Sequence, residues 1–100
     1  MPKNYHDVYK HSLENPEDFW AEAASSIFWT KSWDKVLDDT RPPFYRWFPG
    51  AETNTCYNAV DRHVEAGNGD RTALIYDSVM TGTKRQITYK ELQDQVTQFA

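Results

Sequence analysis

The amino-acid sequence predicts an α+β fold in a chain long enough for one domain at most. Apolar residues recur at helical spacing near the N-terminus and again at the C-terminal end. Two short β-prone runs flank the turn Thr81-Gly82-Thr83, and proline pairs interrupt the region before them. The expected order is a helical N-terminal hairpin, an extended segment rich in aromatic residues and proline, a helix, a β-hairpin and a truncated C-terminal helix.

Two helices are expected before residue 29. Asn15 suits the N-cap of the second helix, and Pro16 suits its first position, with acidic residues directly after it. One broad apolar face then follows, made of Phe19, Trp20, Ala23, Ala24, Ile27 and Phe28. A shorter helix precedes it and carries on one side Tyr5, Val8, Tyr9 and Ser12. Together the two helices predict the hairpin.

Residues 29–53 cannot continue the helix, because Pro42-Pro43 and Pro49-Gly50 interrupt it. Short extended pieces are expected at Lys35–Leu37 and Tyr45–Phe48. Large rings are too frequent here for a flexible linker, so the segment is expected to wrap a neighbour. The side chains expected to pack onto that neighbour are Trp33, Phe44, Trp47 and Phe48.

The second half of the chain predicts a helix, a hairpin and a last helix. Asn54 is the expected cap of a helix whose main face carries Cys56, Ala59, Val60 and His63, and Gly67 and Gly69 are expected to end it with positive φ angles. Ala73–Tyr76 and Gln86–Tyr89 are the expected strands. Thr88 and Glu91 have the spacing of a capping box, which starts an apolar face made of Tyr89, Leu92, Val96 and Phe99. Because this pattern still runs at Ala100, the chain is expected to be cut from a longer protein.

Composition disfavours several classes of partner. The net charge is −4 with both signs interspersed, and no basic patch points to nucleic acid. No apolar run approaches the roughly 20 residues of a membrane span, and the N-terminus resembles no targeting peptide. A single cysteine cannot form an internal disulfide, which fits a reducing compartment. We therefore expect a cytoplasmic protein that binds neither nucleic acid nor membrane.

Cys56, Asp61 and His63 raise the question of a catalytic or metal-binding group. On a helix Cys56 and His63 share a face but lie about 10 Å apart, which is too far for a nucleophile–base hydrogen bond of about 2.6–3.2 Å. A zinc site needs further ligands at spacings that are not present. We expect a small buried cysteine and a histidine in a structural hydrogen bond. Asp61 and Arg62 point to different helix faces, so each is expected to anchor a different segment, although Arg62 could equally be an exposed charge.

Three weaker patterns also favour structural roles. "MTGTKR" has one glycine and a strand after it, so a hairpin turn is favoured over a phosphate loop. "TRPPFYRW" fits either a polyproline-type ligand or, more readily, a stiffened segment that packs its own aromatics. The four tryptophans could line a ligand pocket, but core packing is the default expectation. No catalytic, cofactor-binding or metal-ligating residue is therefore assigned.

Several segments, taken together and in order, resemble acetyl-CoA synthetase-like enzymes. "NPEDFWAEAASSIFW" is similar to their opening, and "RWFPGAETNTCYNAVDRHV" to the block that follows. "GDRTALIYDS", "TGTKRQITYKEL" and "VTQFA" resemble the start of their adenylating domain. The sequences "CYNAVDRHVEAGNGD" and "IYDSVMTGTKR" most resemble the propionyl-CoA synthetase branch. The resemblance covers nearly all of residues 5–100.

The resemblance implies an ATP-dependent, AMP-forming ligase. Such an enzyme activates a short-chain acid as an acyl-adenylate, releases pyrophosphate and transfers the acyl group to the thiol of coenzyme A, with magnesium accompanying the ATP. The family's phosphate loop, its acidic ATP-contacting motifs and its late lysine have no counterpart in this chain. Five residues match a family block that we interpret as structural, namely Asn54, Asn58, Asp61, Arg62 and His63. The chain by itself is therefore predicted to be inactive.

The resemblance also divides the chain. Residues 1–70 correspond to a wrapping N-terminal region, and residues 71–100 to the start of the AMP-binding domain, whose remainder is the expected partner. A hypothesis from a different class is a stand-alone Trp- and Pro-rich interaction module without enzymatic activity. An independent module should cap its last helix, so the uncapped end favours the N-terminal portion of a synthetase.

Overall fold

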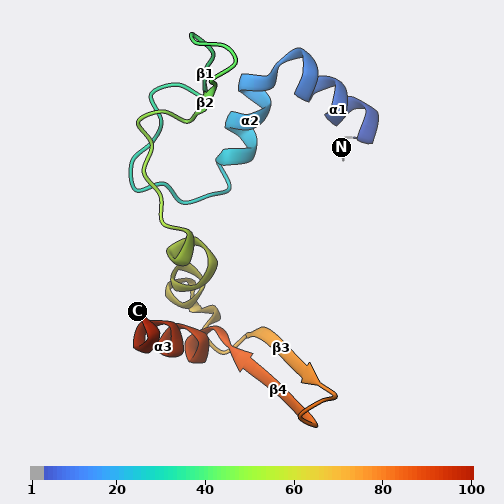
Figure 1. Cartoon of the computed structure of the whole chain (residues 1–100), viewed down its shortest axis with the longest axis vertical. Coiled ribbons are helices and arrows are strands. Elements are labelled where there is room, and N and C mark those ends of the chain that lie inside the picture. The colour runs from blue at the N-terminus through green and yellow to red at the C-terminus, as the bar shows by residue number, and fades with distance from the viewer. Residues whose placement is uncertain (1–3) are drawn as a thin grey trace. The chain divides into compact units, whose positions relative to one another are not determined.

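The structure is a computed structural model that describes residues 4–100. The chain divides into two compact units, a first that ends at Thr53 and a second from Asn54 to Ala100. Each unit is described by itself (Figure 1). The observed elements confirm the α+β class. The boundary expected after residue 70 separates family regions rather than packed units, and it stays a prediction.

The first unit begins with two consecutive helices, α1 (Tyr5–Glu14) and α2 (Pro16–Ala24), drawn in blue to cyan in Figure 1. The side chain of Asn4 caps α1 by accepting a hydrogen bond from the backbone N–H of Asp7 at 3.0 Å. Pro16 opens α2, as its fixed φ angle predicts. The two helices meet where the His11 ring lies edge-on to Phe19, with the ring centroids 5.8 Å apart.

Helix α2 ends earlier than its apolar pattern predicts. The expected face runs to Ile27 and Phe28, but both residues lie beyond the helix and are exposed. The hydroxyl of Ser25 donates to the carbonyl of Glu22 at 2.6 Å, and that of Ser26 donates to the carbonyl of Ala23 at 2.9 Å. Serine side chains compete in this way for backbone groups of the last turn, which accounts for the early end.

Two very short strands, β1 (Leu37–Asp38) and β2 (Arg46–Trp47), pair antiparallel, with Leu37 opposite Trp47. β2 lies within the expected piece Tyr45–Phe48, whereas β1 shares only Leu37 with the expected piece Lys35–Leu37. Asp38 ends β1, and its carboxylate accepts hydrogen bonds from the hydroxyl of Thr40 at 2.7 Å and from the backbone N–H of Thr40 at 3.1 Å. These bonds, that to the hydroxyl first, lower the pKa of Asp38.

Aromatic rings form the centre of the first unit. Trp29, Trp33 and Phe48 contact one another, with centroid distances of 5.2–5.4 Å. The indole N–H of Trp29 donates to the carbonyl of Ala24 at 2.9 Å, and Ala24 is only 5% exposed. This cluster confirms the expected packing of Trp33 and Phe48. Phe44 lies in the loop between β1 and β2 and is 80% exposed, so its expected packing onto a neighbour stays a prediction.

The second unit begins with a helical run over residues 55–68 that contains two π-helical segments, η1 (Tyr57–Asp61) and η2 (Val64–Asn68). Asn54 caps the run as predicted, since its side chain accepts from the backbone N–H of Tyr57 at 2.9 Å. Gly67 has the expected positive φ, at 85°. The same expectation for Gly69 is wrong, because its φ is −57°. Its carbonyl instead accepts from the backbone N–H of Lys90 at 2.9 Å, which ties this turn to the last helix.

A β-hairpin follows, made of β3 (Thr72–Ser78) and β4 (Thr83–Thr88), drawn in orange in Figure 1. The strands pair antiparallel from Thr72 opposite Thr88 to Ser78 opposite Thr83, with a bulge between Thr72 and Leu74. Gly82 in the connecting turn has a φ of +65°, which a glycine adopts without strain. The hairpin confirms the sequence prediction, with strands longer than expected.

The last helix, α3 (Tyr89–Phe99), starts with the predicted capping box. The backbone N–H of Glu91 donates to the Thr88 hydroxyl at 3.2 Å, and the backbone N–H of Thr88 donates to the Glu91 carboxylate at 2.8 Å. The backbone bond from Thr88 is the main cause that lowers the pKa of Glu91 below its ordinary value of 4.5. Tyr89 is the first residue of this helix, whereas the sequence analysis placed it at the end of the expected strand Gln86–Tyr89.

Little apolar surface is buried in either unit. Among residues 4–100 the buried hydrophobic side chains are Ala24 at 5% and Val60 at 7% exposure. Large apolar side chains that stay exposed include Tyr5, Leu13, Phe44, Ile75, Val79, Met80 and Phe99. No helix in the described part of the chain is long and apolar enough to cross a bilayer. The packing therefore depends on few side chains, so substitutions among those few should have large effects.

The aromatic cluster gives a first prediction. Trp29→Ala removes a ring that contacts Trp33 and Phe48 and leaves the carbonyl of Ala24 without its indole donor. We expect the free energy of unfolding of the first unit to fall by about 2 kcal/mol, less than for a fully buried tryptophan. Urea unfolding followed by circular dichroism measures it. The matched control Phe44→Ala should change it by less than about 0.5 kcal/mol, and equal effects of the two variants would contradict the assignment of the cluster.

The capping box predicts a pH dependence. Because the pKa of Glu91 is lower in the folded than in the unfolded chain, its contribution is present above pH 4.5 and is lost as the pH falls through the folded pKa. We expect the amide protection of α3 to decrease with acid over that range, measured by hydrogen exchange. In Glu91→Gln the side-chain oxygen can still accept from Thr88 but does not titrate. That variant should lack this component, and identical acid profiles would be inconsistent with it.

Candidate functional site

The block around the single cysteine is the natural candidate for chemistry. Cys56 lies in the helical run and is exposed, so the expectation of a buried cysteine is wrong. Its Sγ lies 4.0 Å from Oδ2 of Asp61. His63 is half-buried, and its ring contacts that of Tyr89 with the centroids 5.0 Å apart. The side chains of Cys56 and His63 therefore contact different residues, Asp61 and Tyr89.

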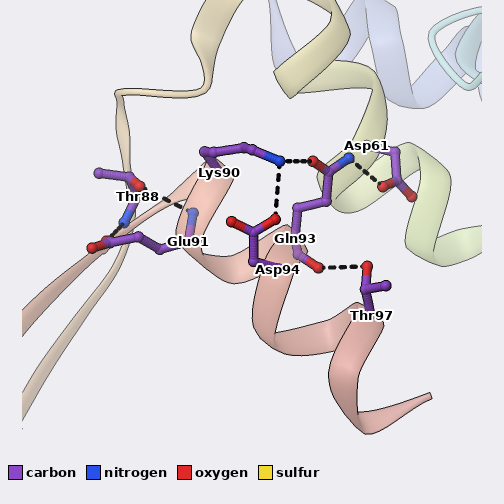
Figure 2. Close-up of polar contacts among 7 residues, drawn as sticks. All are labelled: Asp61, Thr88, Lys90, Glu91, Gln93, Asp94 and Thr97. Atoms are coloured by element: carbon purple, nitrogen blue, oxygen red, sulfur yellow. Dashed lines mark hydrogen bonds and ion pairs between the residues drawn. The ribbon is translucent and has the colours of Figure 1, made fainter.

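Asp61 links this block to the last helix. Its Oδ1 accepts a hydrogen bond from the side-chain amide of Gln93 at 2.8 Å. The amide oxygen of Gln93 accepts from Nζ of Lys90 at 3.2 Å, and Lys90 forms an ion pair with Asp94 at 2.9 Å. Figure 2 shows these side chains as a continuous chain of polar contacts beside the capping box. The prediction that Asp61 anchors a neighbouring segment is thus confirmed, and the segment is α3. Arg62, at the next position, is half-buried.

The chemistry of these groups fits an anchor better than a catalytic centre. A reactive thiolate is stabilised by a positive neighbour, whereas the group recorded beside Sγ of Cys56 is the carboxylate of Asp61. That carboxylate also accepts the bond from Gln93, which positions it toward α3. Within residues 4–100 no three side chains among His, Cys, Asp and Glu come together as metal ligands would. That the chain contributes no catalytic, cofactor-binding or metal-ligating residue stays a prediction.

The remaining polar side chains of the helical run bond to other groups within the same run. The side-chain amide of Asn58 donates to the carbonyl of Asn54 at 3.0 Å. The phenol of Tyr57 donates to the carboxylate of Glu65 at 2.6 Å, and this bond raises the pKa of Tyr57. The sequence analysis missed the roles of Glu65 and of Gln93. No local signal marks the Asp61–Gln93 pair, since 32 positions separate the two residues.

The first unit offers an aromatic groove rather than a polar site. Trp20, Trp47 and Phe48 line an open groove of about 330 Å³, and the Trp20 and Trp47 rings lie 6.1 Å apart. Ligand sites combine apolar walls with a few converging polar groups, whereas the lining of this groove is aromatic. In the nearby Pro-rich loop, Phe44 and Tyr45 are exposed. The geometry favours a surface that another polypeptide covers over a pocket for a small polar molecule.

Comparisons with known proteins give one consistent result. The family model described as "Acetyl-coenzyme A synthetase N-terminus" matches residues 5–59. The human protein "Acyl-CoA synthetase short-chain family member 3, mitochondrial" is 48% identical over 96 residues, which are 96% of this chain and 14% of that protein. An "Acetyl-coenzyme A synthetase" of Magnetococcus marinus is 43% identical over 100 residues, and one of Deinococcus radiodurans is 44% identical over 96. The chain thus spans about 14–15% of the length of these relatives.

The link between Asp61 and Gln93 gives a prediction for the second unit. Asp61→Ala removes a charged acceptor from a partly buried hydrogen bond, worth about 1 kcal/mol at this exposure. Hydrogen exchange of the α3 amides should then become about fivefold faster. Asp94→Ala breaks only the ion pair within α3 and should have a clearly smaller effect. A larger effect of Asp94→Ala would show that the contact between elements does not hold α3.

Proposed function

The chain belongs to the family of acetyl-coenzyme A synthetase N-termini, and we propose that it forms the non-catalytic N-terminal part of a short-chain acyl-CoA synthetase. The observation that supports this most is the agreement between the family match over residues 5–59 and relatives that align with nearly the whole chain. The aligned residues include the block from Asn54 to His63, whose contacts in the structure are those of a structural anchor.

The proposed parent enzyme converts ATP, a short-chain acid and coenzyme A into acyl-CoA, AMP and pyrophosphate. The carboxylate attacks the α-phosphorus of ATP, and pyrophosphate leaves. The thiol of coenzyme A then attacks the acyl carbon, and AMP leaves as a far better leaving group than oxide. Magnesium accompanies the ATP in this proposal. Propionate is the proposed acid, and its only support is the resemblance of residues 56–70 and 75–85 to the propionyl-CoA synthetase branch. None of these steps is assigned to a residue of this chain.

The proposed role of the chain is to wrap and buttress the adenylating domain. Support comes from exposed apolar side chains in both units, among them Leu13 and Phe44 in the first and Ile75 and Phe99 in the second. Large apolar side chains rarely remain in contact with water over a wide area of a free-standing protein. The rest of the synthetase is therefore the proposed partner. Cytoplasmic localisation stays a prediction, and the mammalian relatives carry the word mitochondrial in their own names.

A stand-alone interaction module is the second candidate function. The exposure of Phe44 and Tyr45 beside Pro42-Pro43 favours it, because such a loop could enter an aromatic-lined groove of a partner. The aromatic cluster of the same unit disfavours it, since Trp29, Trp33 and Phe48 pack on each other rather than outward. A module also has no reason to align over its whole length with synthetases.

A chimera tests the proposed function. The 96 matching residues of the human relative are replaced by those of this chain, and acyl-CoA formation and thermal stability are measured. We expect the chimera to fold and to keep the relative's activity within about tenfold, because exchanging a structural segment leaves the reacting groups in place. The chain alone should release no pyrophosphate from ATP. A folded chimera without activity would contradict the proposal.

Two controls sharpen this experiment. Removing the 96 residues should destabilise the relative, which shows that the segment matters. A synthetase that carries this chain as its own N-terminus, assayed with acetate, propionate and butyrate, tests the acid separately. A clear preference for acetate would overturn propionate and leave the proposed class of enzyme intact.

A further inference from the structure

The helical run ends in the chain's one Asn-Gly pair, Asn68-Gly69. In such a pair the backbone nitrogen of the glycine can attack the amide carbon of the asparagine side chain, because glycine has no Cβ to obstruct the approach. Asparagine is among the heat-labile residues of proteins. Every other asparagine of the chain precedes a residue that has a side chain. Asn68 is therefore the position at which this chemistry is expected first.

The reaction needs only water as a co-reactant. A bond forms between the backbone nitrogen of Gly69 and Cγ of Asn68, and the bond from Cγ to Nδ2 breaks. Nδ2 leaves as ammonia and takes the proton of the Gly69 amide. Water then opens the cyclic imide at either of its carbonyl carbons and returns a proton to the nitrogen. Opening at Cγ gives aspartate, and opening at the main-chain carbonyl gives isoaspartate, in which the main chain runs through the former side chain.

The fold holds this pair in a conformation that disfavours the reaction. Asn68 is the last residue of η2, where Gly67 is the residue that departs from helical dihedral angles, and Gly69 is helical with φ −57° and ψ −33°. In a helix the side chain leans toward the N-terminus, whereas the next backbone nitrogen lies on the C-terminal side. The nitrogen of Gly69 and the amide carbon of Asn68 are thus turned away from each other. Attack requires the turn to open first.

Backbone hydrogen bonds tie this turn to the start of α3. The carbonyl of Gly69 accepts from the N–H of Lys90 at 2.9 Å, and the carbonyl of Arg71 accepts from the N–H of Tyr89 at 3.0 Å. The turn itself is closed by a bond from the N–H of Arg71 to the carbonyl of Asn68 at 3.1 Å. No residue of α3 is buried, so these bonds break without the loss of an apolar core. Opening of the turn therefore depends on how firmly α3 is attached.

We propose that Asn68-Gly69 is a self-modification site whose reaction depends on the detachment of α3. While α3 is bonded to the turn, the pair stays helical and the imide does not form. Local opening lets the pair reach the conformations in which the ring closes. Both products add a negative charge close to Asp70, and isoaspartate also lengthens the main chain within the turn. The modified turn no longer fits α3, so each opening that leads to reaction is recorded permanently.

The contacts that carry this inference lie within the second unit, and the inference does not rest on the proposed function. Its test uses the chain alone and measures a chemical conversion rather than acyl-CoA formation. Failure of that test would leave the family assignment and the chimera experiment unaffected.

Incubation of the whole chain in warm buffer at neutral pH tests the dependence on α3, with peptide mass spectrometry to follow the conversion of Asn68. The rate in the folded chain should be at least about tenfold below the rate in urea. Asp61→Ala removes the bond to Gln93 and should raise the folded rate about fivefold. The matched control Asp94→Ala breaks only the ion pair within α3 and should raise it clearly less. Equal rates in the folded and unfolded chain, or equal rates in the two variants, would overturn the proposal.

A second variant tests the chemistry apart from the fold. Gly69→Ala fits the structure, because a φ of −57° suits alanine and the added Cβ would make an ordinary contact with Cβ of Lys90 at 3.5 Å. That Cβ hinders the attacking nitrogen, so conversion in urea should become at least about tenfold slower. Undiminished conversion would exclude the imide route. In the purified isoaspartate form of the original chain the α3 amides should exchange faster, and exchange at the unmodified rate would overturn the link between the turn and α3.

Discussion

Apolar burial is the scarce quantity in this chain, and the rest of the structure depends on it. Ala24 and Val60 are the buried hydrophobic side chains within residues 4–100, while Ile75 and Phe99 face water. A large part of the driving force for folding is therefore left unused by the chain alone.

Local polar contacts and a few ring contacts, rather than apolar burial, hold the elements of each unit together. Side chains cap the start of α1, of the helical run and of α3, namely those of Asn4, Asn54 and Thr88. The expected cap of α2, Asn15, makes no such side-chain bond. The indole of Trp29 joins the aromatic cluster to the end of α2, and Asp61 joins the helical run to α3 through Gln93. Contacts of this kind define secondary structure but bury little area, which fits a segment that completes its packing on another polypeptide.

The difference between local and distant contacts also explains what the sequence could predict. The capping box, the Gly82 turn and the start of α2 at Pro16 depend on residues within four positions of one another, and all were predicted. The end of α2 was missed because the hydroxyls of Ser25 and Ser26 outweigh an apolar pattern that continues. The exposure of Cys56 was missed because its place on the apolar face of a helix predicts burial only where something covers that face. The Asp61–Gln93 contact has no local signature, although its role as an anchor was expected.

The heat capacity change of unfolding tests this account most directly, because it reports the apolar surface that folding removes from water. A compact domain of 100 residues gives about 1.2–1.5 kcal/mol/K. We expect calorimetry of the dilute chain to give less than about half of that value, because few apolar side chains are buried in either unit. A single cooperative transition with the full heat capacity change would contradict the account, since it would require an apolar core that the structure does not contain among residues 4–100.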